Sequence, residues 1–201
     1  MRTVPVTLAL ILMSIFGFLL LYLNAPVSWV GQLTFVDFRV VAGELVFQPF
    51  NDQYWRLLTP IFIHFGWLHI TFNSLWLWEL GALIEQRLGS LFLLLLVVGS
   101  GAGSNLAQYL YTGPSLFGGM SGVVYALLGF CWVYNYLLPQ SGLGVPRGIV
   151  AFMIGWLVFC MVGATEMLGF GSIANAAHVG GLLLGCLGAA LAGSWQRFLK
   201  G

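Results

Sequence analysis

The chain has 201 residues, of which 60% are hydrophobic and only 13, seven basic and six acidic, carry full charge. A soluble domain of this length carries about 50 charged side chains, so the composition excludes a water-soluble globular domain. The 27 glycines show no triplet repeat, which excludes collagen. A net charge of +1 lacks the excess of basic residues that a nucleic-acid-binding protein uses to contact phosphates. The class that remains is a polytopic membrane protein.

Uncharged stretches mark the candidate membrane spans, because a charge at mid-bilayer is costly and a spanning helix needs about 20 apolar residues. The stretch from Leu88 to Pro146 is long enough for two helices and contains the turn-like sequence Thr-Gly-Pro-Ser at 112–115. The pattern predicts an all-α membrane bundle of six transmembrane helices in one domain, 1–201. The expected spans are residues 4–23, 57–86, 89–111, 121–138, 148–165 and 174–195.

The basic residues predict the orientation of these spans, because Lys and Arg accumulate in cytoplasmic loops. Six spans leave two cations, Arg39 and Arg56, on the external side. Both termini are therefore expected in the cytoplasm, together with Arg2, Arg87, Arg147, Arg197 and Lys200. A cleaved signal peptide over 4–23 is the alternative, but its apolar run exceeds the usual 7 to 15 residues or so and no small-x-small site follows.

The first loop, residues 25–55, is long and rich in aromatic residues such as Trp29. We expect it to dock at the membrane interface, where Trp and amphipathic segments are favoured; a simple folded loop is the alternative. The three cysteines, Cys131, Cys160 and Cys186, fall inside spans and are expected to be free thiols.

A serine opens the fourth span within the sequence Gly-Gly-Met-Ser-Gly at 118–122. At a helix N-terminus, Ser121 has free backbone N–H groups beside its Oγ, and the helix dipole favours a developing oxyanion. This is the arrangement that acyl transfer requires. Taken alone, the motif is equally typical of an ordinary N-cap serine.

His178 is the candidate base for Ser121, because the sixth span also begins on the external side and so places the two residues at similar depth. Gly181 and Gly185 lie on the same helical face as His178, and Gly122 lies on a matching stripe of small residues on span four, so the two helices can pack closely. Tyr125, one turn after Ser121, could pack against the imidazole. A structural, hydrogen-bonded histidine is the alternative reading.

The second span carries His69 and Asn73 at positions i and i+4, on one helical face at about the same depth. Both side chains can donate hydrogen bonds to an oxyanion. We expect no metal site, because no carboxylate lies at this depth and Asn is a poor transition-metal ligand. A structural pair that bridges helices is the alternative.

Over residues 54–185 these motifs together resemble the rhomboid family of intramembrane serine proteases, and especially its compact six-span bacterial members. The matching motifs are Trp55-Arg56, His64 with His69-x-x-x-Asn73, Glu85-x-Arg87, Gly119-Met120-Ser121-Gly122 with Tyr125, and Ala177-His178-x-x-Gly181-x-x-x-Gly185.

The resemblance implies a dyad without an aspartate, in which Ser121 is the nucleophile and His178 the general base. It implies that His69 and Asn73, with the Ser121 backbone, stabilise the oxyanion and that Tyr125 orients the imidazole. It implies that Gly181 permits the close approach of spans four and six, and it implies structural roles for His64, Trp55, Arg56, Glu85 and Arg87.

The resemblance also implies a location and a substrate class. The protein would sit in the bacterial inner membrane, use no cofactor, and cut transmembrane proteins with one span near the external boundary. The loop 166–173 would cap the site and span five would be its mobile gate. A water-filled cavity is needed, for which Thr71, Asn73, Gln108 and Asn175 are candidate lining residues.

Three other functions use similar features. A rhomboid-like pseudoprotease would bind membrane segments without cutting them, but both Ser121 and His178 are present. A transporter or channel would be expected to show an inverted repeat or paired broken helices, which the sequence lacks. A lipid acyl hydrolase uses the same chemistry, and the dyad alone does not exclude it.

Overall fold

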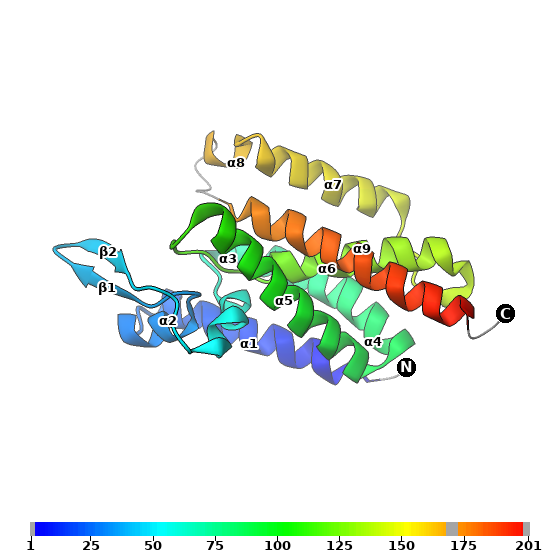
Figure 1. Cartoon of the computed structure of the whole chain (residues 1–201), viewed down its shortest axis with the longest axis horizontal. Helices are drawn as coiled ribbons and strands as arrows, with labels where there is room; N and C mark the ends of the chain where they lie inside the picture. Colours follow the sequence, from blue (N-terminus) through cyan, green and yellow to red (C-terminus); the bar gives the residue numbers. More distant parts are fainter. Residues whose placement is uncertain (1–2, 168–172, 199–201) are drawn as a thin grey trace.

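The computed structural model describes residues 3–167 and 173–198, and it is a mostly helical bundle (Figure 1). Short 3-10 and π segments are labelled η. In chain order its elements are α1 (Pro5–Tyr22), α2 (Val27–Leu33), β1 (Phe38–Val41), β2 (Glu44–Phe47), η1 (Tyr54–Leu57), η2 (Thr59–Phe62), α3 (Trp67–Trp76), η3 (Leu77–Gly81), α4 (Ala82–Leu88), α5 (Ser90–Thr112), α6 (Ser121–Leu137), η4 (Pro139–Ser141), α7 (Arg147–Met161), α8 (Ala164–Met167) and α9 (Asn175–Phe198).

Three helices in the described ranges, α1, α5 and α9, are long and apolar enough to cross a membrane. The helices α6 and α7 are also apolar but shorter. The segments α3, η3 and α4 follow one another without a break, since the residues at their junctions keep right-handed helical backbone angles. The expectation of a mostly helical membrane protein is confirmed.

The helix α6 forms the centre of the bundle and is buried continuously from Gly122 to Cys131. It packs along α9, with α5 beside both of them. The helix α7 runs along the outer edge of the bundle next to α9, whereas α1 lies on the opposite edge (Figure 1). The helix that begins with Ser121 is thus held on several sides, and α7 has few neighbours.

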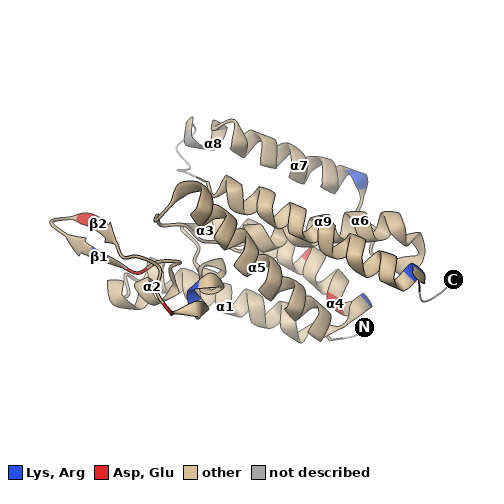
Figure 2. Ribbon diagram, in the orientation of Figure 1, with Lys and Arg blue, Asp and Glu red and all other residues tan. Residues whose placement is uncertain are grey.

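The two ends of the chain lie at the same end of the bundle, and the two strands project from the other end (Figure 1). Basic residues gather at the end that carries the termini (Figure 2): Arg87 in the last turn of α4, Arg147 at the start of α7 and Arg197 in the last turn of α9. Arg2 and Lys200 lie outside the described residues, and so do residues 168–172 of the expected cap 166–173.

The first loop contains a β-hairpin, so the expectation of an all-α fold is wrong in this segment. The strands β1 and β2 pair antiparallel, with Phe38 opposite Phe47 and Val41 opposite Glu44. Ala42 and Gly43 form the turn, and both have positive φ, 52° and 87°. Such two-residue turns with left-handed backbone suit the twist of a hairpin. The flanking runs, rich in β-branched and aromatic residues, therefore form strands.

The second helix begins ten residues later than expected, at Trp67 instead of residue 57. The intervening residues form the 3-10 turns η1 and η2 and a short loop, and Pro60, which lacks an N–H, interrupts any continuous helix there. Ile61 and Ile63 are nevertheless fully buried. The apolar run therefore reflects burial inside the protein as well as contact with lipid, and composition alone does not separate the two.

Two further irregularities lie within expected spans. The fifth helix, α7, ends at Met161, and the left-handed Gly163 (φ 75°) separates it from the short helix α8, so no single helix covers 148–165. The second is the π-helical segment η3, which contains the exposed Glu79. A π segment adds a residue to a helical turn and changes the direction of the side chains that follow.

Candidate active site

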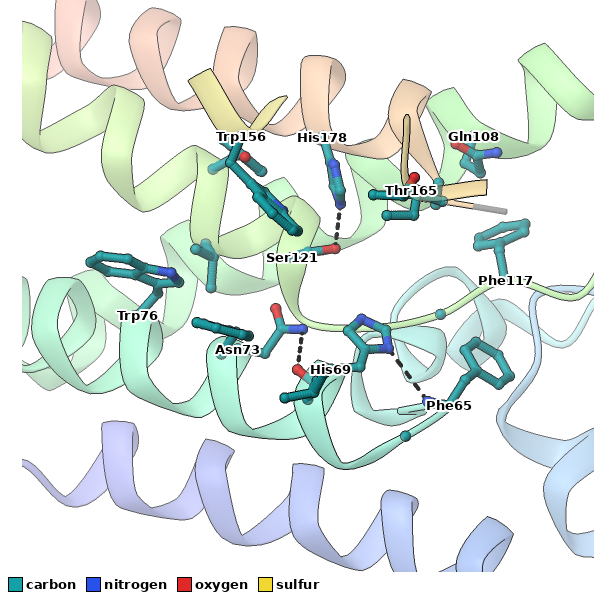
Figure 3. Close-up of a pocket in the computed structure, with 18 of the residues that line it drawn as sticks. Phe65, His69, Asn73, Trp76, Gln108, Phe117, Ser121, Trp156, Thr165 and His178 are labelled. Atoms are coloured by element: carbon teal, nitrogen blue, oxygen red, sulfur yellow. Dashed lines mark hydrogen bonds between the residues drawn. The ribbon is translucent and has the colours of Figure 1, made fainter. Parts of the chain in front are cut away.

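Ser121 and His178 are joined by a hydrogen bond of 2.7 Å between the serine Oγ and the imidazole Nε2 (Figure 3). Ser121 is the first residue of α6, and His178 lies in the first turn of α9. Both helices begin near the end of the bundle away from the termini (Figure 1), so residues that are distant in the chain meet there. His178 is only 4% exposed, and its imidazole is almost fully enclosed.

Glycines bring the backbones of α6 and α9 into direct contact beside this pair. A Cβ atom at Gly181 would overlap the carbonyl oxygen of Gly122, and one at Gly185 would overlap that of Ala126. An added Cβ at Gly122 would lie 2.5 Å from the Oγ of Ser104 on α5. A larger residue at Gly181 or Gly185 would push α6 and α9 apart, and one at Gly122 would push α6 away from α5, so these glycines maintain the packing that brings Ser121 and His178 together.

Tyr125 packs against the imidazole of His178. The two ring centroids are 4.9 Å apart, with 38° between the ring planes. The Tyr125 hydroxyl donates a hydrogen bond of 2.9 Å to the carbonyl oxygen of Met153 on α7. This side chain therefore contacts both the dyad and the peripheral helix.

His69 faces the same space as Ser121, from α3 (Figure 3). Its Nδ1 accepts a long hydrogen bond, 3.4 Å, from the backbone N–H of Phe65. A neutral imidazole that accepts at Nδ1 carries its proton on Nε2, so Nε2 is a donor. Gly119, two residues before Ser121, has a φ of 117°, and a Cβ there would lie 2.5 Å from that Nε2. The loop that leads to Ser121 thus passes directly over the His69 ring.

Asn73 lies on the same face of α3 as His69 and is 6% exposed. Its Nδ2 donates a hydrogen bond of 2.9 Å back to the carbonyl oxygen of His69 (Figure 3). The amide nitrogen therefore points back along its own helix, while the residue lines the same cavity as Ser121. It would have to rotate, or share its second hydrogen, to serve another acceptor.

The His64 side chain binds the loop that precedes Ser121. Its Nε2 accepts a hydrogen bond of 3.4 Å from the backbone N–H of Met120, and its Nδ1 lies 3.1 Å from the carbonyl oxygen of Phe62. The N–H of Gly119 donates to the carbonyl oxygen of Pro60 at 2.9 Å. These contacts fix the residues on the N-terminal side of the serine.

A cavity of about 960 Å³ opens in front of the dyad (Figure 3). Its polar lining includes His69, Asn73 and Gln108 together with Ser121 and His178. Aromatic side chains of α3 and α7 form much of the remaining wall: Trp67, Phe72, Trp76, Phe152 and Trp156. Of the four lining residues expected from sequence, Asn73 and Gln108 are part of the wall, whereas Thr71 and Asn175 are not among its described members.

The comparisons with known proteins agree with this geometry. The model of the rhomboid domain matches residues 51–195. The chain belongs to the rhomboid family. Rhomboid protease GlpG of Serratia proteamaculans (strain 568) is 53% identical over 135 residues, which cover 67% of this chain and 47% of that protein. Rhomboid protease GlpG of Yersinia pestis (strain Pestoides F) and of Yersinia pseudotuberculosis (serotype O:3, strain YPIII) is 38% identical over 187 residues, 91% of this chain and 61% of those proteins. The chain therefore spans about half to three-fifths of the length of these relatives.

Two of the rhomboid-like sequence motifs lie away from the cavity and hold loops in place. Arg56 is 1% exposed; its guanidinium donates to the carbonyl oxygens of Gly31 and Thr34, and its Nη2 lies 3.8 Å from Asp37 Oδ1. Burial lowers the pKa of Arg56, and the Asp37 carboxylate opposes this change. Trp55 donates through Nε1 to a carbonyl of α2 at 3.3 Å.

The Glu85-x-Arg87 motif joins three segments at the opposite end of the bundle. The Glu85 carboxylate accepts hydrogen bonds from the N–H groups of Val6 and Thr7 at 2.9 and 2.8 Å, and from the hydroxyls of Thr7 and Ser90, both at 2.7 Å. It therefore caps the start of α1. The Arg87 guanidinium packs on Gly142, where an added Cβ would lie 2.7 Å from Cζ.

Sequence reasoning missed one polar residue near His178, Thr165, and one of the contacts of Gln108. Thr165 on α8 is 1% exposed and lines the cavity close to His178 (Figure 3). Gln108 was expected only as a lining residue, but its Oε1 also accepts the N–H of Ala177 at 3.1 Å and so caps the start of α9. No group of three or more His, Cys, Asp or Glu side chains suited to a metal occurs within 3–167 and 173–198.

Proposed function

We propose that the protein is an intramembrane serine endopeptidase that cleaves single-span membrane proteins near the external membrane boundary. The observation that carries this proposal is the hydrogen bond between Ser121 Oγ and His178 Nε2 at the wall of a large cavity. Membership of the rhomboid family and the similarity to relatives named Rhomboid protease GlpG support it.

The proposed reaction is peptide hydrolysis through an acyl-enzyme. His178 Nε2 takes the Oγ proton as Ser121 attacks the scissile carbonyl carbon, and the imidazolium then gives this proton to the leaving amine. A water molecule from the cavity, deprotonated by the same Nε2, attacks the ester carbonyl, and the imidazolium returns the proton to the departing Ser121 Oγ, which releases the second fragment as a carboxylic acid. Tyr125 holds the imidazole by ring contact.

The oxyanion is stabilised by donors from two elements. The Ser121 N–H at the start of α6 has no partner within its own helix, as is general for the first turn. The imidazole of His69 and the carboxamide of Asn73 line the same cavity from α3, and Asn73 Nδ2, which donates to the His69 carbonyl oxygen, turns or shares its second hydrogen to reach the oxyanion. Preorganised donors of this kind stabilise the developing charge strongly, because they need no reorganisation during reaction.

The substrate segment enters between α3 and α7. Aromatic side chains of both helices line the cavity there, and the rings of Trp76 and Phe152 lie 6.1 Å apart. An apolar wall of this kind suits the side chains of a membrane span. The peripheral helix α7 is the gate that moves aside, since few contacts hold it to the bundle.

The membrane arrangement proposed is a single rhomboid-like domain of six spans in the bacterial inner membrane, with both termini in the cytoplasm. Three helices are long enough to span by themselves, and α3 with η3 and α4, α6, and α7 supply the others. The basic residues at the end with the termini support this orientation. A C-terminal fusion to green fluorescent protein should fluoresce, whereas a fusion to alkaline phosphatase should be inactive; the reverse result would refute the orientation.

The function is tested with purified protein in detergent and a model single-span substrate. We expect cleavage by the wild type and by Ser28→Ala, a matched control because Ser28 is exposed on α2. Ser121→Ala and His178→Ala should leave the substrate intact. Cleavage that persists in Ser121→Ala would refute the nucleophile assignment.

Labelling with a fluorophosphonate separates the related functions. A pseudoprotease would neither label at Ser121 nor cut the substrate. A lipid acyl hydrolase would label at Ser121, release fatty acid from phospholipid and leave the peptide intact. The proposed endopeptidase labels at Ser121 and cuts the peptide.

A further inference from the structure

Two buried polar atoms, one helical turn apart on α9, have no hydrogen-bond partner among the residues that the structure describes. They are Oδ1 of Asn175 and Nδ1 of His178. Residues at i and i+3 lie on the same face of a helix. Buried polar atoms in native proteins are normally paired with protein groups or with ordered water. Each of the two atoms is therefore expected to have a hydrogen-bond partner, either a protein group or an ordered water molecule.

The two atoms are complementary in hydrogen bonding. Because Nε2 of His178 accepts the proton of Ser121 in the proposed reaction, the neutral imidazole carries its own hydrogen on Nδ1, which is then a donor. The carboxamide oxygen of Asn175 is an acceptor. One atom can supply what the other lacks, either directly or through one water molecule.

The other end of the Asn175 side chain has a partner already. Its Nδ2 donates a hydrogen bond of 3.1 Å to the carbonyl oxygen of Cys160 on α7. This contact determines which end of the carboxamide is left for the imidazole. It also ties Asn175 to the last turn of the peripheral helix.

We propose that Asn175 is a positioning residue for His178, whose Nδ1–H it holds through a single bridging water bound to Oδ1. The inference rests on the proposed role of His178 as the base. The Nδ1 proton stays in place throughout, while Nε2 gains and loses the Ser121 proton. The bridge keeps the Nε2 lone pair directed at Ser121 and stabilises the imidazolium, as an orienting carboxylate does in a catalytic triad.

The same carboxamide connects the dyad to α7. If α7 moves aside to admit a substrate, the bond from Asn175 to the Cys160 carbonyl must break or follow it. The orientation of the imidazole is then linked to the position of the gate. Tyr125, which packs against the imidazole, provides a second link to α7 through its hydrogen bond to Met153.

The test uses two substitutions that separate the two ends of the side chain. Asn175→Asp keeps an oxygen acceptor and removes the donor to Cys160, whereas Asn175→Ala removes both. Asn135→Ala, on α6 near the opposite end of the bundle, is the matched control. The polar and titratable groups that face the imidazole include Ser121 and Tyr125 on α6 and His69 on α3, and all three are unchanged in these variants.

The first measurement is the rate at which a fluorophosphonate labels Ser121 as a function of pH. For Asn175→Ala we expect the maximum labelling rate to fall by about 10- to 100-fold, the scale on which loss of an orienting partner affects a metal-ligating histidine. For Asn175→Asp we expect labelling to persist with its acid limb moved up by about 1 to 3 pH units, because a carboxylate favours the imidazolium. Equal behaviour of the two variants would show that only the tether to α7 matters and would overturn the proposal.

The second measurement does not depend on catalysis. With ¹⁵N-labelled histidine, the His178 signals are assigned by their loss in His178→Ala. We expect a slowly exchanging Nδ1–H in the wild type and in Asn135→Ala, and its loss or displacement in Asn175→Ala. An unchanged Nδ1–H signal in Asn175→Ala would overturn the inference, whereas a wild-type protein that shows the signal but cuts no peptide would refute only the proposed function.

Discussion

The carbonyl oxygen of Gly122 occupies the place that a side chain at Gly181 would need. The two helices that carry Ser121 and His178 thus touch through their backbones. We predict that Gly181→Ala separates α6 from α9, destabilises the protein by about 1 to 3 kcal/mol as overpacking does, and removes most activity. Thermal unfolding in detergent and fluorophosphonate labelling measure the two effects.

Gly188 on the same helix provides the matched control. A Cβ added there would meet Leu96 and Phe130 at 3.9 and 4.0 Å, which is ordinary contact. Gly188→Ala should therefore keep both the unfolding temperature and the labelling rate of the wild type. If Gly181→Ala behaved in the same way, the close approach of the helices would not be needed for the dyad.

Gly119 combines a left-handed backbone with contact to the His69 ring. We predict that Gly119→Ala moves the loop before Ser121 and lowers kcat by about 10-fold or more, on the scale of one lost oxyanion donor. Gly113→Ala is the control, because Gly113 also has a positive φ, 71°, but nothing lies within 4 Å of the added Cβ. If both variants lowered kcat by the same factor, the cause would be backbone strain and not contact with His69.

Asn73 is proposed to donate to the oxyanion, which exists only during reaction. Asn73→Ala should therefore lower kcat by about 100- to 1000-fold with little change in KM. Thr71→Ala, an exposed position on the same helix outside the described cavity wall, should be neutral. A normal kcat in Asn73→Ala would remove this residue from the oxyanion site.

Glu85 accepts four hydrogen bonds at the start of α1 and α5. Glu85→Gln keeps the shape of the side chain but replaces one acceptor oxygen by a donor amide, which leaves buried donors unpaired. We predict a loss of about 1 to 3 kcal/mol in the free energy of unfolding. The exposed Glu79 is the matched carboxylate, and Glu79→Gln should leave stability unchanged; equal losses would contradict the capping role of Glu85.

The sparse charges of the sequence explain how much of the bundle could be predicted. Charges separate the apolar stretches, so α1, α5, α6 and α9 begin and end close to the expected positions. The proximity of Ser121 and His178 was predicted from depth and side of the membrane, since both helices begin on the same side. The structure has the two side chains in hydrogen-bond contact.

The elements that sequence reasoning missed depend on backbone details that hydropathy does not register. The hairpin did have a signal, because Ala42 and Gly43 separate two runs rich in β-branched and aromatic residues. Pro60 signalled the late start of α3, but the buried apolar residues around it resemble a span in composition. The unpaired Oδ1 of Asn175 has no signature in sequence at all, because it depends on which end of the amide faces α7.

The central claim is that Ser121 and His178 hydrolyse a peptide bond of a membrane-embedded substrate. The most direct measurement reconstitutes the protein with a single-span substrate in proteoliposomes and determines the masses of the products. We predict two fragments from one cut near the external boundary with the wild type, and intact substrate with Ser121→Ala. An intact substrate with a wild-type protein that labels at Ser121, or the same fragments from Ser121→Ala, would contradict the account.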